Sequence, residues 1–156
     1  MQRAIEIAER GRGKVQPNPL VGCVLVRDGK IIAEGWHGNI GGFHAEQAAI
    51  ADAEERGITT SGSTAYVTLE PCNHHGRTPP CTEALLWAGV ERVIVGALDP
   101  NPTVRGGGLS ALRDVGVSVK NGILEKECKH QMREFIHWCE HLSLIHISEP
   151  TRPLDI

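Results

Sequence analysis

Three short, largely apolar runs constrain the fold of this chain more than any other feature. Residues 21–26, 65–69 and 92–98 each have the length of a strand and lack the polar alternation of a strand with one face in water. Continuous runs of this kind are typical of strands buried on both faces, as in sheets that carry helices on each side. The sequence therefore predicts a central sheet in an α/β fold.

The segments between these runs predict the remaining elements. Asp28 and Gly29 form a tight-turn signal, so we expect residues 31–36 to pair with the first run as a hairpin. A hairpin followed by strand–helix–strand units predicts a mixed sheet with helices on both faces. The pattern further predicts a short first helix ending near Gly11, helices over 44–56, 82–88, 109–115 and 124–139, and a last strand over 117–120.

Composition excludes several classes of function. The 156 residues suit one domain, and a net charge of −3 leaves no electrostatic footprint for nucleic acid. No apolar run is long enough to span a membrane, and the first residues lack the apolar stretch of a secretory signal. Five cysteines without an export signal fit a reducing compartment, where thiolates can bind metal. We therefore expect a cytoplasmic protein that binds neither nucleic acid nor membranes.

Two separate motifs carry the chemistry. His44-Ala45-Glu46 opens a predicted helix, and only from its first turn can both side chains reach one site. Cys72 follows a predicted strand at the edge where open α/β sheets bind ligands, and Cys81 begins a helix whose N–H groups favour a thiolate. Each motif alone is a weak signal, because His-x-Glu is common and the two cysteines are nine residues apart. Together they indicate zinc held by one His and two Cys, with Glu46 as an off-metal proton carrier.

The run from Pro71 to Cys81 also carries a family resemblance. With Asn18 between two prolines and the loop at residues 99–102, it closely resembles the deaminase domain of the bifunctional riboflavin-biosynthesis deaminase/reductases. The resemblance covers about residues 1–141. It implies a cytidine-deaminase-like fold, a three-layer α/β/α sandwich around a mixed five-stranded sheet. It also implies deamination of 2,5-diamino-6-ribosylamino-4(3H)-pyrimidinone 5′-phosphate to 5-amino-6-ribosylaminouracil 5′-phosphate, with release of ammonia.

Carried over by position, the resemblance implies Zn²⁺ as cofactor, with His44, Cys72 and Cys81 as ligands and Glu46 as the catalytic proton shuttle. Arg77 stands where the family has a Lys or Arg facing the substrate phosphate, and its fork can bond two phosphate oxygens. The implied substrate-binding residues are Asn18, His37, His74, Arg77, Asp99 and Asn101.

Without the resemblance, several of these positions have plainer interpretations. Asn18 and Asn101 lie between prolines and are typical turn residues. The glycine run 106–108 favours a plain loop over a phosphate cradle. We expect His75 and Arg105 to be solvated surface residues.

Residues 142–156 depart from the family pattern. There the family continues with a short polar stretch and the first strand of an NADPH-dependent reductase domain, whereas residues 142–152 resemble a translated sequencing-library adapter. We therefore expect a deaminase domain over residues 1–141, a non-native tail over residues 142–156, and no reductase domain. A homo-oligomer is compatible with the sequence.

Two alternatives remain open. The same fold could deaminate a nucleoside, a free base or a tRNA adenosine, although the acidic charge balance disfavours tRNA and Arg77 favours a small phosphorylated substrate. A binding module with a closed structural zinc site would need a fourth protein ligand, such as His74 or His75. That interpretation leaves Glu46 without a purpose.

Overall fold

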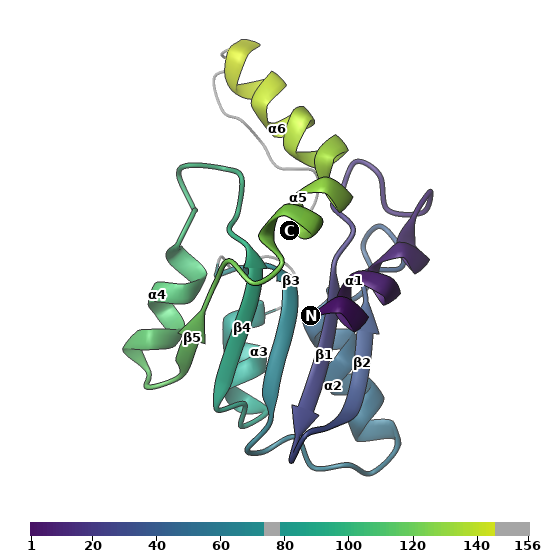
Figure 1. The fold of residues 1–156 in the computed structure, drawn as a ribbon, viewed down its shortest axis with the longest axis vertical. Coiled ribbons are helices and arrows are strands. Elements are labelled where there is room, and N and C mark those ends of the chain that lie inside the picture. Colours follow the sequence, from purple (N-terminus) through teal and green to yellow (C-terminus); the bar gives the residue numbers. More distant parts are fainter. Residues whose placement is uncertain (74–78, 146–156) are drawn as a thin grey trace.

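The computed structural model describes residues 1–73 and 79–145, which form a layered fold around one mixed sheet (Figure 1). The sheet has five strands in the order β2-β1-β3-β4-β5. β1 pairs antiparallel with β2 and β3, whereas β3 and β4, and β4 and β5, run parallel. The predicted mixed sheet is therefore confirmed. The strands are β1 (Gly22–Arg27), β2 (Lys30–Trp36), β3 (Thr64–Leu69), β4 (Arg92–Ala97) and β5 (Ser118–Lys120).

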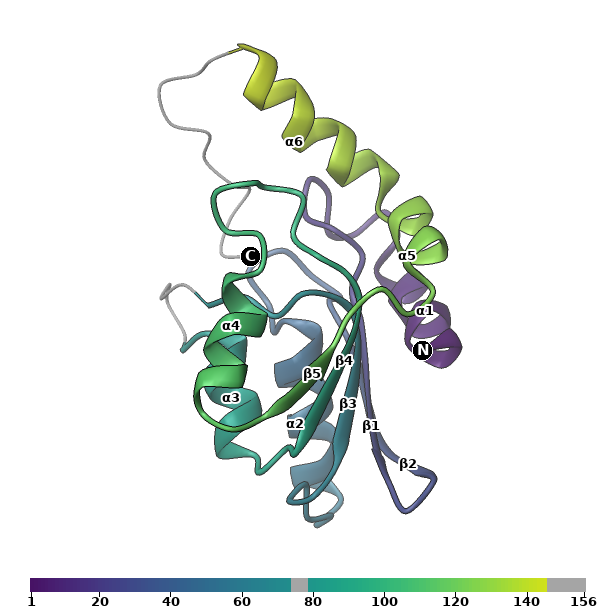
Figure 2. The ribbon, with the colours of Figure 1, turned by 60° about the vertical axis from the view of Figure 1, so that its left-hand side comes forward.

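Helices cover both faces of the sheet, as Figure 2 shows. α2, α3 and α4 lie side by side on one face, and α1 and α5 lie on the other, which gives the three layers that the family resemblance implies. Among the described helices, none combines the length and the apolar composition that a membrane span requires. The helices are α1 (Gln2–Ala8), the 3₁₀ turn η1 (Glu9–Gly11), α2 (Ala45–Glu55), α3 (Cys81–Trp87), α4 (Gly107–Asp114), α5 (Glu125–Gln131) and α6 (Arg133–Ile145).

The prediction of one long helix over residues 124–139 is wrong. α5 ends at Gln131, α6 begins at Arg133, and the N–H of Met132 is shared between the carbonyls of Cys128 and Lys129. Such shared bonds are common where the last turn of a helix tightens. The sequence hides the break because Cys128, Met132 and Phe135 are all buried on one continuous apolar stripe.

α6 continues to Ile145 and therefore crosses residue 141, where we expect the deaminase domain to end. Residues 146–156 lie outside the described residues, so the proposed non-native tail stays a prediction.

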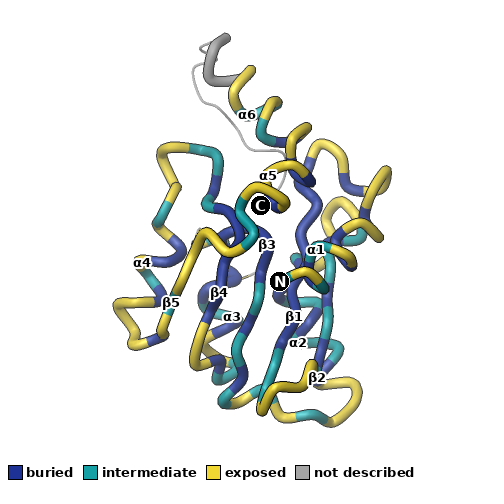
Figure 3. Tube along the Cα trace, viewed as in Figure 1, coloured by how far each residue is buried: buried dark blue, intermediate teal, exposed yellow. Residues whose placement is uncertain are grey.

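Close packing of α2 on β2 brings the start of α2 to the end of the sheet. Ala45, Ala49 and Ala53 are fully buried and recur every fourth residue, so α2 presents a face of small side chains. They meet Gly35 of β2, where an added Cβ would lie 2.2 Å from the backbone nitrogen of Ala49. The burial map in Figure 3 shows the same interior, with the middle of the sheet and the inner faces of the helices buried.

Replacing Gly35 with alanine should lower the free energy of unfolding by about 1–3 kcal/mol, because the new methyl group meets helix backbone that cannot rotate away. Urea denaturation would measure this as a lower midpoint at unchanged slope. Gly107→Ala is the matched control, since nothing lies within 4 Å of a Cβ at that position. Equal midpoints for the wild type and Gly35→Ala would contradict the close contact.

Candidate metal centre and active site

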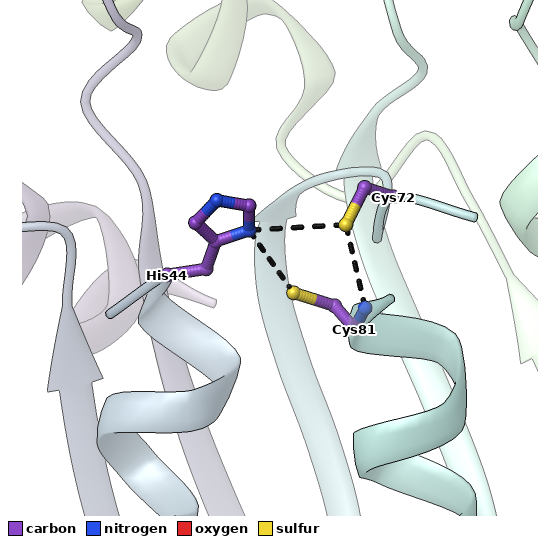
Figure 4. A group of neighbouring side chains, drawn as sticks. All are labelled: His44, Cys72 and Cys81. Atoms are coloured by element: carbon purple, nitrogen blue, oxygen red, sulfur yellow. Dashed lines mark hydrogen bonds between the residues drawn. The ribbon is translucent and has the colours of Figure 1, made fainter. Parts of the chain in front are cut away.

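The candidate site lies at the edge of the sheet where β3 and β4 end. The two strands are parallel and Leu69 pairs with Ala97, so the residues that follow both strands meet at this edge. Cys72 lies in the segment after β3, and Asp99 lies in the segment after β4. His44 is the N-cap of α2 and Cys81 is the first residue of α3, so two helix N-termini point to the same place (Figure 4).

Three potential metal ligands converge here. The Nδ1 atom of His44 lies 3.2 Å from the sulfur of Cys81 and 3.8 Å from the sulfur of Cys72. All three donor atoms lie within 4.8 Å of one another. Around a tetrahedral zinc, nitrogen and sulfur ligands at their usual bond lengths are about 3.6 Å apart. The donor set therefore fits zinc, both in its spacing and in its nitrogen and sulfur atoms.

Local hydrogen bonds hold each donor in place. The backbone N–H of His44 donates to Oε1 of Gln47 at 3.0 Å, which fixes the first turn of α2. The N–H of Cys81 donates to the sulfur of Cys72 at 3.3 Å, and the N–H of Thr82 donates to the carbonyl of Cys72 at 3.2 Å. The segment after β3 is thus tied to the start of α3, which explains how two cysteines nine residues apart serve one site.

The pKa values of three side chains at the site differ from those of free side chains. Hydrogen bonding from Cys81 lowers the pKa of Cys72, and the same contact together with burial raises the pKa of Cys81. Glu46 is buried, and burial raises its pKa to about 7, with the neighbouring Cys72 adding to the shift. A carboxyl group that titrates near neutral pH can both accept and return a proton. Glu46 lies two residues after His44 and lines the same small cavity.

A hydrogen-bonded relay orients Asn18. Nδ1 of His37 lies 3.0 Å from the carbonyl of Phe43, which can only accept, so this nitrogen carries the proton. Nε2 of His37 then accepts from Nδ2 of Asn18 at 3.2 Å. Burial lowers the pKa of His37, which favours this neutral form. Oδ1 of Asn18 is buried and has no hydrogen-bond partner among the described residues. The relay therefore presents an acceptor that a ligand could satisfy.

Three neighbouring cavities define the space for a ligand. A cavity of about 30 Å³ is lined by His37, His44, Glu46, Glu70, Cys72 and Asp99 among others. Asn18 does not line it but lines an adjoining cavity of about 210 Å³, which shares Pro19 with the first. A third cavity of about 220 Å³ shares Cys72 and Asp99 with the first and extends along the segment that leads into α4. The site thus continues from the metal donors to the loop between β4 and α4.

The remaining predicted site residues have different outcomes. Asn101 lines neither cavity, and its Oδ1 accepts from the N–H and hydroxyl of Thr103, as in a turn residue. Arg105 is exposed as predicted, yet its guanidinium also donates to the carbonyls of Asp99 and Pro100. His74, His75 and Arg77 lie outside the described residues.

Glu70 is the residue that the sequence interpretation missed. Its buried carboxylate accepts from backbone N–H groups of Asp99, Gly106, Gly108 and Leu109. The expectation that residues 106–108 form a plain loop is therefore wrong, because two of these glycines bind a carboxylate. The available signal was an acidic residue placed directly between a buried strand and Pro71-Cys72, together with a glycine run at a helix start.

Comparison with known proteins identifies the family of the chain. The family model described as the cytidine and deoxycytidylate deaminase zinc-binding region matches residues 1–97, which include all three potential ligands. The chain belongs to the cytidine and deoxycytidylate deaminase family. The predicted cytidine-deaminase-like fold and the resemblance to riboflavin-biosynthesis deaminases are confirmed by its relatives.

Among the relatives of this chain, the riboflavin biosynthesis protein RibD of Actinobacillus pleuropneumoniae is 51% identical over 140 residues. The diaminohydroxyphosphoribosylamino-pyrimidine deaminase of Buchnera aphidicola from Schizaphis graminum is 48% identical over 135 residues. A crystal structure of the Thermotoga maritima diaminohydroxyphosphoribosylaminopyrimidine deaminase/5-amino-6-(5-phosphoribosylamino)uracil reductase superposes with a TM-score of 0.86 at 48% identity.

These matches cover different shares of each protein. The Actinobacillus alignment spans 90% of this chain and 36% of the relative, and the Thermotoga alignment spans 90% of this chain and 40% of that structure. The Buchnera alignment spans 86% of this chain and 90% of the relative. This deaminase family member thus corresponds in length to the Buchnera protein and to a little over a third of the Actinobacillus protein.

Cys72→Ala should abolish stoichiometric zinc binding, because it removes one of three donors. We expect about one zinc per wild-type chain after dialysis, and a loss of affinity beyond the roughly 10–100-fold that removal of an outer partner costs. Elemental analysis of the dialysed protein measures both. Cys139→Ala on α6 makes the same chemical change away from the site and should keep the zinc. Full zinc content in Cys72→Ala would rule out this donor set.

Proposed function

We propose that this chain is a zinc-dependent deaminase of riboflavin biosynthesis. It would convert 2,5-diamino-6-ribosylamino-4(3H)-pyrimidinone 5′-phosphate and water to 5-amino-6-ribosylaminouracil 5′-phosphate and ammonia. The observation that carries the proposal is the convergence of three metal donors beside the buried Glu46. It is supported by the Buchnera deaminase, which matches this chain over most of the length of both proteins.

In this proposal Nδ1 of His44 and the sulfurs of Cys72 and Cys81 hold Zn²⁺. One nitrogen and two thiolate donors suit zinc and do not suit magnesium or calcium, which prefer oxygen. When bound, zinc supplies the Lewis acidity that lets a water ionise near neutral pH. The three donors come from two helix starts and the segment after β3, so elements of the fold position each of them.

Glu46 is the proposed proton carrier. It accepts a proton from the attacking water and returns one to the leaving amine, so that the carbon–nitrogen bond breaks and ammonia departs. Its pKa of about 7, raised by burial, allows both transfers in one turnover. The carboxylate reaches the site from the first turn of α2, where His44 also lies.

The proposed substrate contacts combine the hydrogen bonds of the site with the family resemblance. Oδ1 of Asn18 accepts from an N–H group of the pyrimidine, and His37 keeps that amide oriented. Asp99 and Asn101 belong to the loop proposed to meet the ribosyl phosphate. His74 and Arg77 complete the set as sequence-based proposals, with Arg77 opposite the phosphate.

Several broader assignments are part of the same proposal. The protein acts in the cytoplasm on a small phosphorylated pyrimidine, without nucleic acid or membrane partners, and a homo-oligomer is compatible with this role. The deaminase domain occupies residues 1–141.

Glu46→Gln should retain zinc and lose ammonia release by about 10²–10⁴-fold, because the amide has the shape of the carboxylate and cannot carry the proton. Coupled detection of ammonia measures the rate, and elemental analysis measures the zinc. Glu54→Gln makes the same change at the exposed end of α2 and should leave the rate unchanged. A normal rate in Glu46→Gln would refute the proton-carrier role.

A substrate panel separates this function from the alternatives. The wild-type chain should release ammonia from the diamino-pyrimidinone phosphate and at least about 10²-fold more slowly from cytidine and guanine, because those compounds leave polar groups of the site unpaired. Initial rates at equal substrate concentration provide the comparison. Faster release from cytidine or guanine would assign the fold to a different substrate.

A further inference from the structure

A second buried carboxylate at the site has a role that proton transfer does not explain. Glu70 is 5% exposed and lies directly after β3, two residues before Cys72. Its Oε1 accepts from the N–H groups of Asp99 and Gly106, both at 3.0 Å. Its Oε2 accepts from the N–H groups of Gly108 and Leu109, at 3.0 and 3.3 Å.

The carboxylate offers about four lone-pair positions, and these four bonds occupy all of them. Glu70 is therefore held by main-chain dipoles at the start of α4, where a negative charge is favoured. A carboxylate bound in this way is not available to carry protons or to bind substrate. What it can do is hold two parts of the backbone together.

The backbone around Glu70 is shaped for this contact. Gly106 has φ of 83°, a left-handed conformation that favours glycine. A Cβ on Gly108 would lie 2.1 Å from the carbonyl oxygen of Pro71. Both glycines are thus required where the start of α4 closes over the end of β3.

The segment fixed by Glu70 forms one wall of the larger cavity. That cavity is lined by Asp99, Thr103, Val104, Gly107 and Gly108, together with Cys72 and Asn73 of the segment after β3. Asp99 also lines the small cavity beside the metal donors. The carboxylate of Glu70 therefore connects the strand that leads to Cys72 with the loop that closes the outer part of the site.

We propose that Glu70 is a positioning residue that holds the segment 99–109 in its substrate-binding shape and thereby sets the affinity for the ribosyl phosphate end. This inference rests on the proposed function. If only a fraction of molecules hold the binding-competent loop, the apparent dissociation constant rises in inverse proportion to that fraction. Loss of the carboxylate therefore raises KM and leaves the chemistry at the metal donors in place.

Glu70→Gln is the first test. Glutamine keeps one accepting oxygen, but its NH₂ group faces two backbone N–H donors that it cannot satisfy. We expect KM for the phosphorylated substrate to rise about tenfold, as when the competent fraction falls to about a tenth. kcat should stay within about threefold, zinc per chain should not change, and the preference for the phosphorylated over the dephosphorylated substrate should fall about tenfold.

A second variant keeps the test valid if Glu70→Gln does not fold. Gly106→Ala leaves the carboxylate intact and strains the loop through its φ of 83°, with nothing within 4 Å of the new methyl group. It should reproduce the rise in KM. Gly116→Ala is the matched control, since Gly116 has φ of 90° in equally open space at the other end of α4 and should leave KM unchanged.

The outcomes are distinguishable. An unchanged KM in a folded Glu70→Gln variant, an equal loss with both substrates, or a loss of zinc would overturn the positioning role. Failure of the wild type to release ammonia would count against the proposed function instead. In that case calorimetry with ribose 5-phosphate decides the role of Glu70, because weaker binding by the variant than by the wild type supports it and equal binding overturns it.

Discussion

The parallel pairing of β3 with β4 is the constraint on which the rest of the site depends. Parallel strands end at the same edge, so Cys72 and Asp99 come together although 27 positions separate them in the sequence. The connection between the two strands is α3, whose first residue is Cys81, and a crossover helix must begin at the edge where the first strand ends. Two cysteines and a loop are thus placed by topology, and α2 supplies His44 and Glu46 to the same edge.

The two buried carboxylates at this edge, Glu46 and Glu70, differ in their surroundings. Glu46 lies near Cys72, and burial raises its pKa to about 7. Glu70 instead receives four main-chain N–H groups, which satisfy its charge. Identical side chains are therefore suited to different purposes, one to proton transfer and the other to holding the backbone. Neither purpose can be read from residue type alone.

Much of the fold and the metal donor set could be predicted from the sequence, because both depend on local or family-specific patterns. Apolar runs locate the strands to within a residue or two, and the string from Pro71 to Cys81 is specific enough to indicate the donors. Other features depend on contacts that no local pattern carries. The break at Met132 leaves the apolar stripe intact, so periodicity cannot reveal it. The bonds of Glu70 reach residues 29 to 39 positions away, and only the folded chain brings them together.

The turn at Asp28 and Gly29 lies at the end of the sheet opposite the site. Both residues have positive φ, as two-residue hairpin turns require, and the connections into β3 and β4 lie at the same end. The candidate active site thus lies at one end of the sheet, and the hairpin turn and the connections into β3 and β4 lie at the other. Insertions, affinity tags or a fused domain placed at the Asp28–Gly29 turn would therefore leave the reactive end undisturbed, which makes this turn the natural point at which to elaborate the scaffold.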